Sequence, residues 1–80
     1  MRLQVANLPM DTIPEDVLAL LAEHCVVTHV DLVQAGPGGA FSGFANAVVG
    51  GEDPAEGARV AIAALNNSTY RHNRIMVSRV

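Results

Sequence analysis

The spacing of apolar residues changes from a period of two to a helical period near the start of the chain. Leu3 and Val5 alternate with less apolar neighbours over residues 2–7, which predicts a half-buried strand. Residues 12–15 (Thr-Ile-Pro-Glu) then have the spacing of a capping box, with proline in the first helical turn. We expect a helix that ends near Cys25 and turns one face inward, formed by Val17, Leu20, Leu21 and His24.

The middle of the chain predicts two further strands joined by a glycine-rich connection. Residues 26–33 are rich in β-branched and apolar side chains, and their uneven spacing implies a bulge near Thr28 and His29. Residues 35–40 form a flexible connection, and residues 42–49 alternate again. The expected inward positions are Val27, Val30 and Leu32, then Gly43, Ala45, Ala47 and Val49, with Phe44, Asn46 and Val48 facing outward.

The last third predicts a second helix and a fourth strand. Asp53 and Pro54 start the helix, Asn66 and Asn67 end it, and its inner face holds Ala58, Ala61, Ile62 and Leu65. Residues 74–79 form a strand with Ile75 and Val77 inward and Met76 and Ser78 outward. The order βαββαβ indicates a ferredoxin-like α/β fold, a four-stranded antiparallel sheet with two helices on one face and the other face open.

Composition limits what such a chain can be. Eighty residues, half of them apolar and 16% charged, are typical of one globular domain spanning residues 1–80. No stretch approaches the ~20 apolar residues of a membrane helix, and one cysteine, Cys25, forms no internal disulfide. We expect a soluble, intracellular, cytoplasmic protein without a membrane segment. The net charge of −3 counts against strong non-specific binding to nucleic acid.

Catalytic and metal chemistry find little support in the sequence. His24, Cys25 and His29 offer three ligands where a structural zinc site needs four, so a packed histidine and a small thiol are the favoured reading. The glycines of residues 36–39 lack the lysine and helix start of a phosphate loop, and no serine stands in a nucleophile elbow. We expect no enzyme activity, no metal and no cofactor.

Three segments resemble the RNA recognition motif family: residues 5–9 (Val-Ala-Asn-Leu-Pro), residues 42–49 (Ser-Gly-Phe-Ala-Asn-Ala-Val-Val), and the pattern Ala58, Ala61, Ile62, Leu65, Asn66. The resemblance extends from Arg2 to Val80, and it implies the predicted fold with single-stranded RNA lying across the open sheet face. Of the family's stacking aromatics, Phe44 is retained, whereas Gln4 and Asn46 replace the other two. We therefore expect a degenerate member that binds RNA weakly.

The RNA-binding residues expected from this resemblance are Phe44, Gln4, Asn46, Met76, Ser78, Arg79 and Arg2. Phe44 stacks on a base or is simply an exposed apolar side chain, and the two amides either contact base edges or are merely solvated. Arg2 and Arg79 would sit together at one edge of the sheet as a phosphate site, unless carboxylates neutralise them. Single-stranded RNA is the expected partner.

Protein association is the alternative function. Leu18 and Ala22 lie beside the inward stripe of the first helix, and outward apolar side chains of the sheet could join an interaction patch. The expected partner is then a protein held by this helix or by the sheet face. The oligomeric state is left open.

Overall fold

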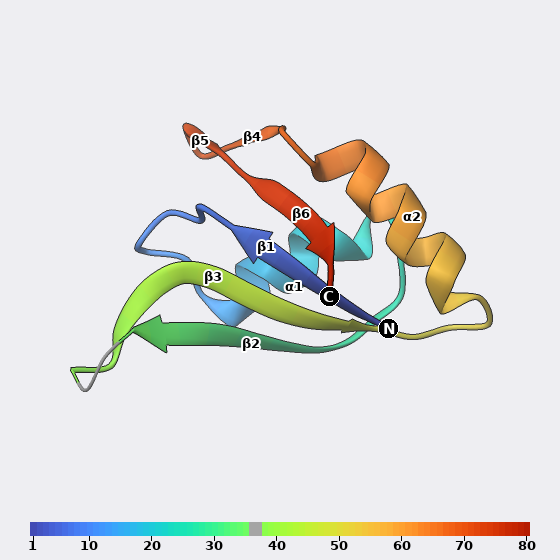
Figure 1. Ribbon diagram of the computed structural model, residues 1–80, viewed down its shortest axis with the longest axis horizontal. Helices are drawn as coiled ribbons and strands as arrows, with labels where there is room; N and C mark the ends of the chain where they lie inside the picture. The colour runs from blue at the N-terminus through green and yellow to red at the C-terminus, as the bar shows by residue number, and fades with distance from the viewer. Residues whose placement is uncertain (36–37) are drawn as a thin grey trace.

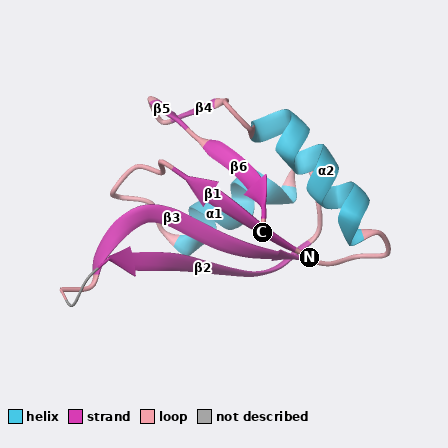
Figure 2. Ribbon diagram, in the orientation of Figure 1, coloured by secondary structure: helices cyan, strands magenta, loops and turns pink. Residues whose placement is uncertain are grey.

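The computed structural model describes residues 1–35 and 38–80, and its main sheet is covered on one side by two helices (Figures 1 and 2). The sheet has four strands in the order β2-β3-β1-β6, all neighbours antiparallel. The elements are β1 (Arg2–Ala6), α1 (Pro14–Ala22), β2 (Val27–Ala35), β3 (Ala40–Val49), α2 (Pro54–Leu65), β4 (Thr69–Tyr70), β5 (Asn73–Arg74) and β6 (Met76–Arg79). The predicted ferredoxin-like fold is confirmed, with one added hairpin, β4–β5.

The core lies between the sheet and the helices, because alternate residues of each strand point to the helix side. Leu3 and Val5 of β1 are fully buried, as are the small residues Ala45 and Ala47 of β3 and Val77 of β6. The side of β3 that faces the core is therefore built of small side chains. The helices contribute Val17, Leu21, Ala58, Ala61 and Leu65 to this core.

The start of α1 differs from the predicted capping box by one residue. The N-cap is Ile13, whose backbone N–H donates to the Asp16 carboxylate at 3.1 Å. Thr12 is buried, and its hydroxyl donates to the carbonyl of Pro9 at 2.6 Å. Thr12 thus closes the preceding turn, so the Thr12–Glu15 box was wrong. The helix also ends at Ala22, which leaves the half-buried His24 outside it.

The predicted bulge in β2 is confirmed. Val27 pairs with Val49 and His29 with Val48, so Thr28 is the extra residue of the ladder. A second irregularity falls between Val33 and Gln34, beside Gly43, whose φ of +87° favours glycine. Residues 36–37 of the expected connection lie outside the described residues.

The β4–β5 hairpin was missed, because its turn lacks the usual Asn-Gly or Gly signal. Arg71 and His72 form the turn with φ values of +48° and +72°, a conformation that glycine and asparagine adopt more readily. Arg71 compensates by donating two hydrogen bonds to the Asp16 carboxylate, at 3.1 and 3.2 Å. Its guanidinium also lies 5.1 Å from the centre of the Tyr70 ring. The expected strand 74–79 is consequently divided at Ile75 into β5 and β6.

Candidate functional site

The open face of the sheet carries a row of polar side chains that crosses all four strands. Asp31 of β2 pairs with Asn46 of β3, Asn46 with Gln4 of β1, and Gln4 with Ser78 of β6. Directly opposed residues in antiparallel strands have Cβ atoms about 4.5–5.5 Å apart. The structure therefore brings together three of the predicted residues, Gln4, Asn46 and Ser78, and adds the carboxylate of Asp31.

An apolar row lies two residues further along each strand. Val33 pairs with Phe44, and Ala6 pairs with Met76. The side chains of Phe44 and Met76 are substantially exposed, at 40% and 54%. Phe44 lies opposite Val33 in the ladder and next to the polar row. Its orientation, outward from the core, agrees with the alternation read from the sequence.

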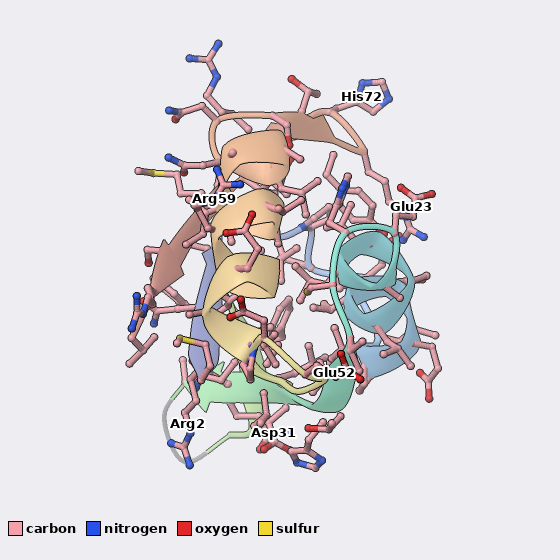
Figure 3. The ribbon with its side chains drawn as sticks, turned by 90° about the vertical axis from the view of Figure 1, so that its right-hand side faces the viewer. Arg2, Glu23, Asp31, Glu52, Arg59 and His72 are labelled. Atoms are coloured by element: carbon pink, nitrogen blue, oxygen red, sulfur yellow. The ribbon has the colours of Figure 1, made fainter. Side chains whose placement is uncertain are left out.

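The third row, on the other side of the polar row, carries the charge. His29 and Arg2 both pair with Val48, one from each neighbouring strand. His29 is exposed, and its Nε2 lies 2.9 Å from the Asp31 carboxylate. Figure 3 places Arg2 and Asp31 at one end of the molecule and His72 at the other. One cation and one anion of fixed charge therefore share this end of the open face.

Arg79 lies on the other side of the sheet from Arg2, which corrects the expected arginine pair. Its partner in the ladder is Leu3, a core residue, so the Arg79 side chain starts on the helix side. There it lines an open groove of about 300 Å³ with α2 residues, among them Arg59 and Ile62. Arg59 also donates to Glu56 on its own helix, at 2.9 Å. The shared phosphate site predicted for the sheet edge is not formed.

Two asparagines join the end of β1 to the added hairpin near the apolar row. Asn7, whose φ is +64°, donates from its side chain to the carbonyl of Arg74 at 2.9 Å. Asn73 donates back to the carbonyl of Asn7 at 3.1 Å. This reciprocal pair fixes the position of Arg74, an exposed cation two residues before Met76. Sequence reasoning did not place Arg74 near the face, since the hairpin was not foreseen.

The open face also includes four residues that the sequence analysis did not select, Asp31, His29, Val33 and Ala6. The signal for the first three was present, because a bulge at Thr28 followed by inward Val30 and Leu32 leaves His29, Asp31 and Val33 outward. The carboxylate of Asp31 disfavours phosphate nearby, but it accepts hydrogen bonds from donor groups.

The outer flank of α1 forms a second surface feature. Leu18 is 42% exposed, and Ala22, one helical turn later, is exposed as well. Leu18 lines an open groove of about 240 Å³ between α1 and the first half of β2, together with Pro14, Glu15, Val27, Thr28, His29 and Val30. An apolar side chain is thus presented beside an edge strand.

Of the three residues considered for a metal site, His24 and Cys25 are partly buried and His29 is exposed. The thiol of Cys25 donates to the carbonyl of Leu21 at 3.5 Å, and burial raises the pKa of this thiol. Within residues 1–35 and 38–80, no group of three or more His, Cys, Asp or Glu side chains is arranged to hold a metal ion. In the same part of the chain, no helix is long and apolar enough to span a membrane.

Comparison with known proteins finds similarity in structure only. No protein-family model matches the chain, and no curated protein matches its sequence. The crystal structure of the RNA-binding protein PG1 is 25% identical over 100% of this chain and 93% of its own, with a TM-score of 0.88. The RNA recognition domains 1 and 2 of Sex-lethal from Drosophila melanogaster are 26% identical, with a TM-score of 0.81 over 99% of this chain.

This chain spans 48% of the Sex-lethal structure, which contains two recognition domains. The RRM domain of Puf1 from S. pombe is 26% identical over 100% of this chain and 96% of its own, with a TM-score of 0.77. The TM-scores show that all three share the overall fold of this chain.

Proposed function

Since this chain is an RNA recognition motif-like domain, we propose that it binds single-stranded RNA, weakly, on the open face of its sheet. The observation that carries the proposal is the position of Phe44. Its exposed ring stands on the central part of the face, in an apolar row that adjoins a row of hydrogen-bonding side chains. An aromatic platform beside donors and acceptors is suited to a base whose ring stacks while its edge is hydrogen-bonded.

Each residue of the face has a distinct role in this proposal. Phe44 stacks on one base, and Met76 supports it from the far strand of the same row. The amides of Gln4 and Asn46 and the hydroxyl of Ser78 contact base edges, since each supplies both a donor and an acceptor. Arg2 contacts phosphate at the charged end of the face. Arg79 has no role here, because its side chain starts on the helix side of the sheet.

Binding is weak because two stacking platforms are missing and the electrostatics are unfavourable. Base–aromatic stacking contributes about 1–3 kcal/mol per base, so two absent platforms cost about 2–6 kcal/mol. The chain has a net charge of −3, and Asp31 lies on the proposed face. A positively charged groove, which most proteins use to hold a single strand, is therefore lacking on this side.

An NMR titration with pools of short single-stranded RNAs tests the proposal. We expect amide shifts confined to β1, β3 and β6, centred on Phe44 and Gln4, with an affinity in the high micromolar to millimolar range, about 10⁻⁴–10⁻³ M. Duplex RNA of the same composition is the matched control and should leave these amides unshifted, since stacking on Phe44 needs an unpaired base. The absence of any shift on the sheet at millimolar RNA contradicts the proposal.

Protein association through α1 is a second candidate, and the exposed Leu18 beside its groove favours it. Leu18→Glu should leave the free energy of unfolding within about 0.5 kcal/mol, because the side chain is already near solvent. The same change should abolish any complex that buries this flank. Ala19→Glu, also on an exposed helix position, is the control for added charge. An RNA titration that is unaffected by Leu18→Glu separates the two functions.

A further inference from the structure

The two edges of the sheet differ in how their backbone groups are satisfied. At the β6 edge, the N–H of Val77 donates to the side-chain oxygen of Asn66 at 3.0 Å. Just before it, Ile75 exchanges backbone hydrogen bonds with Asn67 and Ser68, each of 2.9 Å. The chain that follows α2 therefore covers this edge as far as Val77 and leaves little of it for another strand.

The β2 edge is longer and uncovered. It runs for nine residues, Val27–Ala35, whereas β6 has four. Among the described residues, no hydrogen bond joins the outer side of β2 to another segment. It contains no proline or lysine, which are among the residues that blunt an exposed edge strand, and residues 29–33 pair regularly with β3 between the two irregularities. Its unpaired backbone groups form a template for one more antiparallel strand.

The side chains of β2 are complementary to those of a second β2 turned by 180°. In antiparallel pairing about Val30, each His29 faces Asp31 of the other copy, and the two Val30 residues face each other. His29 and Asp31 lie on the open face, while Val30 lies on the helix side. A shift of the centre by one residue would place two Asp31 carboxylates opposite one another, which is unfavourable. A shift in the other direction would place His29 opposite His29 and would separate His29 from Asp31 of the other copy, so the His29–Asp31 contacts favour the register centred on Val30.

Leu18 adds an apolar side chain near this edge, on the helix side of the sheet. The groove that it lines also includes Val30, so the groove opens at the centre of the proposed pairing. We propose that two copies of this chain associate through their β2 edges, about a two-fold axis at Val30, to form one continuous eight-stranded sheet. The two grooves meet across the axis, and each Leu18 is covered by the other copy. This inference does not depend on RNA binding.

A charge swap tests the interface by sedimentation velocity over about 1 µM to 1 mM protein. The wild-type sedimentation coefficient should rise with concentration. His29→Asp places two pairs of carboxylates face to face across the interface, and should weaken association about tenfold or more. Asp31→His alone should also weaken it, whereas the double variant His29→Asp/Asp31→His restores both pairs and the wild-type concentration dependence.

His29 and Asp31 also contact each other within one copy, at 2.9 Å. The double variant keeps this contact between positions 29 and 31, whereas each single variant loses it. Thermal unfolding at the lowest concentration checks that each variant is folded. A wild type that sediments as a monomer throughout, or a double variant no better than His29→Asp, overturns the proposal.

Disulfide trapping provides a test that does not depend on charge. Opposed residues of antiparallel strands have Cα atoms about 4.5–5.5 Å apart, within the range that a disulfide spans. In a Cys25→Ala background, Val30→Cys should therefore form a covalent dimer under mild oxidation. Ser78→Cys, on the covered β6 strand, is the control and should remain monomeric. Equal cross-linking of both variants, or none at Val30→Cys, contradicts a β2 interface centred on Val30.

Discussion

Replacing Phe44 tests the proposed RNA site most directly, because the structure separates its stacking role from its packing role. Phe44 is 40% exposed and lies opposite Val33 in the strand pair, while the core lies on the other side of β3. Phe44→Leu keeps an apolar group of similar reach against Val33 but removes the aromatic ring. The variant therefore removes stacking of the ring on a base and leaves most of the apolar packing against β2.

The expected effect follows from the free energy of stacking. Loss of one platform costs about 1–3 kcal/mol, which corresponds to a roughly 5- to 150-fold weaker affinity. The cost to folding should stay within about 1 kcal/mol, because an exposed strand position that keeps an apolar residue loses little buried area. Affinity and stability should thus respond very differently to the same substitution.

Fluorescence anisotropy with a short labelled single-stranded RNA measures the affinity, and thermal unfolding measures the stability. Phe44→Trp is the matched variant: it retains an aromatic face and should bind at least as well as the wild type. If Phe44→Leu binds as tightly as the wild type while both are folded, stacking on Phe44 is refuted. If Phe44→Leu unfolds, the ring is structural and the site must be sought elsewhere.

Four further outcomes are expected. Gln4→Tyr should restore a lost platform and tighten RNA binding by about fivefold or more in the same anisotropy assay. Arg2→Ala should weaken RNA binding and make the slope of log affinity against log salt shallower by about 0.7. Arg79→Ala should change neither the affinity nor the slope, because its side chain starts on the helix side. An equal effect of both variants would contradict the observed register. Asp31→Asn should strengthen binding at low salt, with a gain that disappears at about 0.5 M salt. Hydrogen bonds from the Ile13 backbone and from Arg71 lower the pKa of the Asp16 carboxyl. The ionised carboxylate therefore stabilises the fold at neutral pH, and this stabilisation is lost as the pH falls below about 4. The thermal unfolding temperature of Asp16→Asn should be below that of the wild type at pH 7 and should converge with it in acid.

The sequence was sufficient to predict the sheet and its two faces, because alternation reports directly on burial. Leu3, Val5, Ala45 and Val77 are all in the core, where their spacing placed them. The bulge at Thr28 was also predictable, since only an extra residue brings both Val27 and Val30 to the inner side. Local hydrophobic patterning is a strong signal wherever one face of an element is buried.

Register and local turns were less predictable, because they depend on contacts between distant segments. Arg79 was assigned to the open face from its place at the end of the last strand, but alternation from Ile75 and Val77 already assigns it to the helix side. The turn at Arg71 and His72 carries no glycine, and its stabilising partner, Asp16, is 55 residues away. The N-cap shifted because the Asp16 carboxylate bonds to Ile13 while Thr12 bonds to Pro9.

The two proposals, taken together, constrain how RNA could use a paired molecule. A two-fold axis perpendicular to the sheet places both open faces on the same side, so two weak sites become available to one ligand. The same axis reverses the direction of each strand, so the two Phe44 platforms would accept RNA segments of opposite polarity. A short uninterrupted strand cannot run through both sites in the same orientation. Any gain in affinity from pairing should therefore require two binding segments joined by a spacer long enough to turn back. A single contiguous segment should bind the monomeric and the paired protein equally well.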